Sequence, residues 1–276
     1  MSDSSPPVQA VTQDCVIQMR LPPEVSRWFA RSQPREGRVR LFCLPHAGGD
    51  AARFQSWWKI LPAEVEVWPI QLPGHVNRLG EDLFTLLGEL VKGLAGAVQW
   101  LSNKPFAIFG HSMGGLLAFE LARELRRRHA PEPFHLFISA CRPPQLPEPD
   151  RPIAGLPDDR FIAELQRRYG SSLDLGMDAE LAELYLPILR ADMTLCETYK
   201  FAPEAPMEAP ITVFAGLADR RLRREQLERW QIHTRNFFEV QTFPGDHFFW
   251  RDNAAPMLKV IERQLLNFSR PAVAGS

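Results

Sequence analysis

The feature that most constrains the fold is an alternation of short apolar runs with helical patterns along most of the chain. Six apolar runs bounded by turn residues are strand candidates: Val39–Leu44, Val65–Leu72, Phe106–Phe109, Phe134–Ala140, Ile211–Ala215 and Phe238–Phe243. Several are continuously apolar, as expected of strands covered on both faces. Three other segments, 83–100, 116–125 and 257–268, carry apolar residues at helical spacing. This alternation predicts an α/β fold with a mainly parallel, doubly wound sheet.

One region breaks the alternation. Residues 142–210 begin with a proline-rich stretch, RPPQLPEPDRPIAGLP, and continue with helical patterns at about 159–169 and 178–200. No convincing strand occurs there, so we interpret the region as a helical insertion between two strands. Such insertions commonly form a lid over a catalytic face, and a purely structural subdomain is the alternative.

Length and composition place these elements in one domain. The chain has 276 residues, of which 45% are hydrophobic, enough to bury a full core around a single sheet. Residues 28–270 are expected to form this domain. Residues 1–27, rich in Ser, Pro and Gln, are expected to be a flexible leader, and residues 271–276 a flexible tail.

Charge and cysteine content exclude several classes of partner. Lys and Arg number 32 and Asp and Glu 33, so no overall positive field attracts nucleic acid or an anionic membrane. The four cysteines are far apart without a CxxC pair, which argues against a zinc knuckle or a disulfide scaffold. Since the sequence lacks a secretory signal and any run of eighteen apolar residues, we expect a cytoplasmic protein.

The most specific local motif is a GxSxG pattern, Gly110-His111-Ser112-Met113-Gly114. It lies between a strand candidate and a helical pattern, where it is typical of a sharp turn that exposes a nucleophilic serine. The glycines are needed because a Cβ there would clash with the neighbouring strand or helix. A serine that merely caps a helix is the alternative. We predict Ser112 as the nucleophile.

A serine hydroxyl requires a histidine base and an acid that orients the base. In α/β-hydrolases both follow the serine, the acid first. Asp219 follows the strand candidate at 211–215 in AGLAD, and His247 follows the strand candidate at 238–243 in PGDHFFW. Both lie just past strand ends, the edge at which parallel sheets place their sites. We predict Asp219 as the acid and His247 as the base.

Other residues of the same types are weaker candidates. Asp246 would have to fold back to reach the ring of its neighbour His247, and Asp192 belongs to the inserted region. His111 is part of the GxSxG motif. The remaining histidines in helical or strand patterns are more typical of surface or core positions: His129, His135 and His233.

Acyl transfer also needs N–H groups directed at the negative charge that develops on the substrate oxygen. The N–H of Met113, directly after Ser112, is one predicted donor. The loop LPHAGG at 44–49 follows an early strand, and its glycines allow the backbone to approach a ligand closely. We assign the second donor to the N–H of Ala47, with a plain glycine turn as the alternative.

With these residues identified, the chain resembles the type II thioesterases, stand-alone α/β-hydrolases that accompany polyketide synthases and nonribosomal peptide synthetases. The resemblance covers about residues 28–268. It rests on LFCLPHAGG at 41–49, QLPGHVNR at 71–78, PFAIFGHSMGG at 105–115, LRADMTLCETY at 189–199 and GDHFFW at 245–250. It implies an α/β-hydrolase fold, a triad of Ser112, Asp219 and His247, and an oxyanion hole formed by the N–H groups of Ala47 and Met113.

The resemblance also implies a substrate, an aberrant or stalled acyl group on the phosphopantetheine arm of a carrier protein. No metal or diffusible cofactor is expected, because the phosphopantetheine comes with the substrate. Carrier proteins tend to be acidic, so the basic runs at 126–128 and 220–224 are candidate docking patches. A solvated helix face is the alternative for such a run.

The inserted segment would then cover the acyl chain. Its apolar residues Leu181, Leu184, Leu186, Ile188 and Leu189 are candidates to line the channel, and at helical spacing they equally suit ordinary core.

The chain departs from the pattern of the family at three positions. The family more often has tyrosine in place of His46, arginine in place of His75, and alanine in place of Gly115. None of these removes a catalytic group, but His46 beside the oxyanion loop is expected to alter the substrate entrance.

Three other functions remain open at this point. An α/β-hydrolase of small esters and a product-releasing or medium-chain fatty acyl thioesterase would use the same triad. A non-catalytic binding protein could keep the fold, although the intact Ser112, Asp219 and His247 set argues against it.

Overall fold

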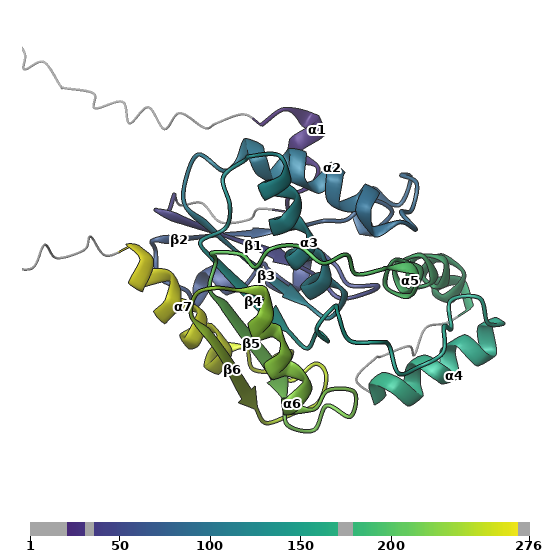
Figure 1. Ribbon diagram of the computed structural model, residues 1–276. Coiled ribbons are helices and arrows are strands. Elements are labelled where there is room, and N and C mark those ends of the chain that lie inside the picture. The colour runs from purple at the N-terminus through teal and green to yellow at the C-terminus, as the bar shows by residue number, and fades with distance from the viewer. Residues whose placement is uncertain (1–20, 31–35, 171–178, 270–276) are drawn as a thin grey trace, which may run out of the picture.

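The computed structural model describes residues 21–30, 36–170 and 179–269, and at the centre of these residues is a sheet of six parallel strands (Figure 1). The strands are β1 (Val39–Leu44), β2 (Val65–Pro69), β3 (Phe106–His111), β4 (His135–Ser139), β5 (Ile211–Gly216) and β6 (Phe238–Phe243). They lie in the order β2-β1-β3-β4-β5-β6. The predicted parallel α/β sheet is therefore confirmed.

Helices cover both faces of the sheet. The described helices are α1 (Pro23–Ser26), α2 (Leu87–Trp100), α3 (Met113–Arg127), α4 (Asp158–Tyr169), α5 (Ala179–Thr198), α6 (Arg224–Leu227) and α7 (Ala255–Ser269). None of them is both long and apolar enough to cross a bilayer.

Successive strand residues point to opposite faces, so each strand contributes to two cores. Phe42 and Ile108 pack with the apolar faces of α2 and α3, whereas Leu41 and Phe109 pack with α7. Figure 1 shows α7 on the side of the sheet away from α2 and α3. Double coverage explains why these strands are continuously apolar in sequence.

Several predicted boundaries differ from the structure, among them the start of one helix and the end of one strand. The helix predicted from residue 83 begins at Leu87, because Leu86 is extended, with φ −116° and ψ 115°. Leu83 instead packs against the turn at Gly74, where a Cβ would lie 2.3 Å from Leu83 Cδ2. The second strand ends at Pro69, and Ile70 makes an isolated antiparallel bridge with Phe29.

The N-terminal part of the described chain is more ordered than the predicted leader. Residues 1–20 lie outside the described residues, as do the predicted tail at 271–276 and residues 31–35 and 171–178. Residues 23–26, at the end of the predicted leader, form α1, whose Val25 is buried. Trp28 is buried beneath the Arg78 guanidinium, which lies 4.8 Å from the centre of its ring. Apolar contacts thus begin before residue 28.

Residues 140–210 connect β4 to β5 and contain α4 and α5, which lie beside the same end of the sheet (Figure 1). Two helices thus lie between β4 and β5, where the sequence predicts an insertion, and its role as a lid stays a prediction. Leu186 and Leu189 of α5 pack with Phe161 and Leu165 of α4 in a separate apolar cluster. Of the other predicted lining residues, Leu184 is 51% exposed and Ile188 is buried, and the side chain of Leu181 lies outside the described residues.

Strand order places two loops side by side. β1 pairs with β2 on one side and with β3 on the other, and Leu44 lies opposite Gly110 in the β1–β3 pair. The loops that follow β1 and β3 therefore leave the same edge of the sheet as neighbours. This is the switch point at which open parallel sheets form their ligand sites.

Candidate active site

Ser112 lies on a sharp turn between β3 and α3. Its backbone has φ 55° and ψ −117°, a conformation that costs free energy for a residue other than glycine. Its N–H donates to the carbonyl of Ser139 on the neighbouring strand, at 2.7 Å. The expected glycines permit the turn: a Cβ on Gly110 would lie 1.9 Å from the carbonyl oxygen of Gly114. The predicted strand-turn-helix context of the GxSxG motif is therefore present.

His247 and Asp219 meet although 28 residues separate them. The loops after β5 and β6 are adjacent because these strands pair in parallel, with Gly216 opposite Phe243. His247 Nδ1 lies 2.8 Å from Asp219 Oδ2, and both side chains are buried. The other carboxylate oxygen of Asp219 accepts the N–H of Arg221 at 2.9 Å. Asp219 is thus held by one hydrogen bond and orients the imidazole with the other.

The second ring nitrogen of His247, Nε2, belongs to a residue that lines the cavity. Since Nδ1–H donates to a carboxylate, Nε2 carries the lone pair. Nε2 is buried and has no hydrogen-bond partner among the described residues. Ser112 and His247 line the same cavity. The arrangement leaves Nε2 available to accept a proton within the cavity.

The two alternative acids have other partners. One oxygen of Asp246 accepts the N–H of Phe248 at 2.8 Å, within the same turn. Asp192 accepts the N–H of Gly48 at 2.7 Å and contacts His75 Nε2 at 2.9 Å. Only Asp219, of these three carboxylates, is found hydrogen-bonded to the His247 ring in the described part of the chain.

The two predicted oxyanion donors lie at the same cavity. Met113 is the first residue of α3, where backbone N–H groups lack intrahelical partners. Ala47 belongs to the loop after β1, and it lines the cavity together with Met113 and Ser112. In this loop the N–H of Gly49 donates to the carbonyl of His46 at 2.8 Å, which closes a tight turn. The loop after β1 and the start of α3 thus bring Ala47 and Met113 to the same cavity as Ser112.

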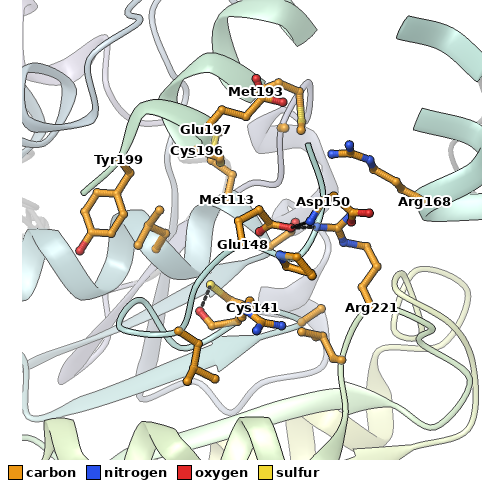
Figure 2. A pocket seen from close by; sticks show the side chains of 18 of the residues that line it. Met113, Cys141, Glu148, Asp150, Arg168, Met193, Cys196, Glu197, Tyr199 and Arg221 are labelled. Carbon is orange, nitrogen blue, oxygen red and sulfur yellow. Dashed lines mark hydrogen bonds and ion pairs between the residues drawn. The ribbon is translucent and has the colours of Figure 1, made fainter. Parts of the chain in front are cut away.

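The cavity has a volume of about 400 Å³ and lies between the sheet edge and the insertion (Figure 2). Its walls mix apolar and charged residues, and the charged ones are Arg142, Glu148, Asp150, Arg151, Arg168, Glu197 and Arg221. Arg221 reaches across to Asp150 at 2.8 Å and to Glu148 at 2.9 Å, as Figure 2 shows. α5 contributes Met193 and Cys196 to the opposite wall.

Tyr169 and Arg221 are contact residues that the sequence does not reveal. The Tyr169 ring lies 4.9 Å from the His247 ring, centre to centre, and the Arg221 guanidinium lies 5.1 Å from the Tyr169 ring. Burial raises the pKa of Tyr169 to about 12, so its hydroxyl stays protonated. No local pattern marks Tyr169, because its partners come from loops far along the chain.

Two further histidines lie beside the pair of His247 and Asp219 and are neutral at neutral pH. Burial lowers the pKa of His46 to about 4 and that of His111 well below its usual value. The His111 ring lies 5.3 Å from the His247 ring, and its Nδ1 accepts the indole N–H of Trp250 at 3.1 Å. Because these rings are neutral, they add no positive charge that would repel an imidazolium at His247.

His46 is not among the residues that line this cavity, and its effect on the substrate entrance stays a prediction. Its ring packs against Phe248 and His111, at 5.0 and 5.9 Å between ring centres. Its Nδ1 donates to the carbonyl of Ala47 at 2.9 Å. The side chain therefore acts on the backbone of the loop after β1 rather than on the cavity.

The basic runs differ in their pairing. The side chains of the first run are bound to carboxylates of the same chain, Arg126 and Arg127 to Glu204 and Arg128 to Glu124. In the second run Arg221 is paired across the cavity. No ion pair of Arg220 is found in the described residues, and its side chain is exposed. The second run therefore retains more unpaired positive charge than the first.

No group of three or more His, Cys, Asp and Glu side chains is gathered as a metal site in the described ranges.

Comparisons with known proteins give a consistent result. The family model described as "Thioesterase domain" matches residues 39–265. The chain is 40% identical over 243 residues to the gramicidin S biosynthesis protein GrsT of Aneurinibacillus migulanus, covering 88% of this chain and 95% of that protein.

Solved structures agree with the sequence relatives. The RedJ thioesterase of the prodiginine pathway in Streptomyces coelicolor has a TM-score of 0.77 at 35% identity, over 84% of this chain and 90% of that one. The type II thioesterase BorB of the borrelidin cluster has a TM-score of 0.77 at 29% identity, over 87% of this chain and 97% of BorB. The predicted α/β-hydrolase fold and the resemblance to type II thioesterases are therefore confirmed.

Proposed function

Because this chain belongs to the thioesterase domain family, we propose that it hydrolyses acyl groups from the phosphopantetheine arm of carrier proteins. That it is a thioester hydrolase follows from the family. The carrier-bound substrate is supported by the similarity to BorB, a type II thioesterase of a biosynthetic cluster, and to GrsT, a gramicidin S biosynthesis protein. In such a pathway the enzyme would remove aberrant or stalled acyl groups from the synthase.

The observation that carries the mechanism is the pair formed by His247 and Asp219, 2.8 Å apart. Asp219 holds the imidazole with Nδ1–H toward the carboxylate, so that Nε2 takes the proton of the Ser112 hydroxyl. Ser112 Oγ then attacks the thioester carbonyl carbon. The C–S bond breaks, the pantetheine thiol leaves with the proton that His247 returns, and the acyl group stays on Ser112.

The N–H groups of Ala47 and Met113 stabilise the oxyanion that forms during this attack. Fixed N–H donors are effective here because they need no reorganisation when the charge develops. A donor of this kind contributes about 10²-fold to 10³-fold to kcat.

Hydrolysis of the acyl enzyme completes the cycle. Water gives a proton to His247 Nε2 and attacks the ester carbonyl, and the proton then returns to Ser112 Oγ as the acid leaves. These steps need no metal and no diffusible cofactor, since the phosphopantetheine is part of the substrate. A thiol has a pKa of about 8.5 and is a good leaving group, so its departure needs little assistance from the general acid.

The cavity favours short or polar acyl groups over medium-chain fatty acids. Its volume is about 400 Å³, and seven residues with charged side chains contribute to its walls. A long hydrocarbon chain would remove water from these charges without replacing their hydrogen bonds, which is costly.

An acidic carrier protein would meet the exposed Arg220, which lies one residue beyond Asp219. The cytoplasmic location expected from the sequence is part of the same proposal. Replacement of Arg220 by Glu should raise the KM for the carrier-bound substrate and leave the hydrolysis of small thioesters unchanged. An unchanged KM for the carrier substrate would remove this docking patch from the proposal.

The experiment that tests the function is hydrolysis of acetyl and longer acyl groups from a phosphopantetheinylated carrier protein beside the matching small thioesters, with Ser112→Ala as the blank. We expect faster turnover of the short carrier-bound groups and an inactive blank. Equal rates on both forms, or activity only on long-chain small thioesters or esters, would contradict the carrier proposal.

A further inference from the structure

The loop of residues 45–49, which carries Ala47, is held by side chains of α5. The N–H of Gly48 donates to Asp192 Oδ2 at 2.7 Å, and the hydroxyl of Tyr185 donates to the carbonyl of Gly48. Leu189 fills the space beside Gly48, where a Cβ would lie 2.5 Å from Leu189 Cδ2. Residues 185, 189 and 192 share one face of α5 because they are four and three positions apart. This face fixes both backbone groups of Gly48.

The peptide groups on either side of Gly48 are also fixed. The carbonyl of Ala47 accepts His46 Nδ1–H, and the carbonyl of His46 accepts the N–H of Gly49. The Ala47 N–H belongs to the same peptide group as the His46 carbonyl. Its direction therefore depends on the turn that α5 holds in place at Gly48.

A third side chain, His75, completes this arrangement. Its Nδ1 lies 2.9 Å from the carbonyl oxygen of Pro73, and its Nε2 lies 2.9 Å from Asp192 Oδ2. A carbonyl and a carboxylate are both acceptors, so each ring nitrogen must donate. With Asp192 ionised, His75 is an imidazolium that forms an ion pair with it, and both side chains are buried, at 4% and 3% exposure.

The surrounding charges favour this protonation state. Burial lowers the pKa of His75, but the hydrogen bond and the charge of Asp192 outweigh it, and the Pro73 carbonyl and Asp50 add to them, so the pKa is raised. On the turn that carries His75, the Arg78 guanidinium binds Glu81.

We propose that His75 and Asp192 form a buried positioning pair that holds the loop of residues 45–49 with the Ala47 N–H directed at the reacting oxygen. The proposal rests on the proposed function, because it takes Ala47 as an oxyanion donor. The imidazolium keeps the Asp192 carboxylate charged and in place, and the carboxylate holds Gly48. Loss of the proton from His75 removes the ion pair and loosens the donor while the triad stays intact.

This role makes the turnover number depend on two histidines with opposite requirements. His247 must be neutral to accept a proton from Ser112. His75 must be charged, so its contribution is complete below its raised pKa and is lost as the pH rises through it. The protein should therefore lose activity on the alkaline side through His75.

The test compares His75→Gln, His75→Arg and Asp192→Asn by kcat and KM for a small acyl thioester across pH. We expect His75→Gln and Asp192→Asn to lower kcat by about 10-fold to 100-fold with KM within about threefold, since a loosened donor loses part of its effect. His75→Arg, whose charge does not titrate, should keep more activity than His75→Gln and lose the alkaline fall. His135→Gln is the matched control, because His135 is also buried but bonds Thr212 away from the cavity.

Native kcat in His75→Gln, a loss confined to KM, or an alkaline fall that persists in both His75 variants would overturn the proposal. Should His75→Gln fail to fold because Asp192 is left unpaired, the double variant His75→Gln/Asp192→Asn carries the test, since it buries no unpaired charge.

A second measurement separates this proposal from the proposed function. Ser112 Oγ displaces fluoride from a fluorophosphonate, forming an O–P bond as the P–F bond breaks. Negative charge develops on the phosphoryl oxygen during this step, whatever the natural substrate is. Slower labelling of Ser112 in His75→Gln would support the positioning pair even if no carrier-bound thioester is hydrolysed. An unchanged labelling rate would contradict it even if carrier-bound thioesters are good substrates.

Discussion

The two sides of the proposed oxyanion hole are held in place by different means. On one side Met113 follows Ser112 directly, and its position is set by the strained turn between β3 and α3. On the other side Ala47 lies on a loop whose shape depends on His75 and on Tyr185 and Asp192 of the insertion. One side is built from residues adjacent in sequence, and the other from residues up to 144 positions apart.

The insertion therefore has two roles: it lines the cavity, and it holds the loop after β1. α5 contributes Met193 and Cys196 to the cavity wall and holds the loop after β1 from its neighbouring face. A movement of α5 would therefore change both the space for the acyl group and the position of an oxyanion donor. The serine side would stay unchanged, because the turn at Ser112 is anchored to β4 through the Ser139 carbonyl.

The largest expected effect comes from Ser112→Ala, which removes the nucleophile and leaves both sides of the hole. We expect kcat to fall by at least about 10⁴-fold, as when the serine of a triad is lost. Burst and steady-state hydrolysis of an acyl thioester measure this change. A burst of released thiol in Ser112→Ala would show that the acyl group is carried elsewhere.

Asp219→Asn should lower kcat by about 10³-fold to 10⁴-fold without unfolding the protein. An amide in place of the carboxylate no longer favours the tautomer in which His247 Nε2 carries the lone pair. Asp246→Asn is the control, because Asp246 accepts the N–H of Phe248 within its own turn. If Asp246→Asn were inactive and Asp219→Asn nearly normal, the acid would have been assigned to the wrong residue.

The same contrast explains what the sequence could and could not predict. The turn at Ser112 was predictable because the motif, the preceding strand and the following helix are contiguous in sequence. Asp219 and His247 were found because parallel strands bring their carboxyl ends to one edge. The contacts that hold Ala47 could not be predicted. No pattern in the neighbouring sequence indicates that Asp192 reaches Gly48 rather than the imidazole of His247. The tight contact of Tyr169 with His247 has the same long-range origin.

Gly114→Ala tests the junction between the two sides. A Cβ at this position would lie 2.3 Å from the Leu44 carbonyl oxygen and 2.6 Å from that of Pro45, so the loop after β1 must move away from α3. We expect a loss of stability of about 1–3 kcal/mol, as for other overpacked sites, and a fall in kcat of about 10²-fold. Thermal unfolding and thioester hydrolysis measure the two effects.

Gly88→Ala is the matched control for this change. Gly88 lies in α2, and a Cβ there meets no atom within 4 Å. Alanine should stabilise this helix by about 0.5–1 kcal/mol and leave kcat unchanged. Equal behaviour of the two variants would mean that the contact between α3 and the loop after β1 is loose.

The smallest effect is expected from Tyr185→Phe, which removes one of the contacts between α5 and the loop and keeps the ring. The carbonyl of Gly48 loses the Tyr185 hydroxyl, while the N–H of Gly48 still donates to Asp192. A neutral hydrogen bond contributes about 0.5–1.5 kcal/mol, so kcat should fall by about twofold to tenfold.

Thr234→Val is the matched control, because it removes a buried hydroxyl that donates to the carbonyl of Ala209 at 2.8 Å, away from the cavity. Thr234→Val should lose at least as much stability, since its hydroxyl also accepts the N–H of Asn236, and only Tyr185→Phe should slow labelling of Ser112 by a fluorophosphonate. If the two variants label at the same rate, the loop after β1 is held by the His75–Asp192 pair without help from Tyr185, and the contribution of α5 reduces to that one carboxylate.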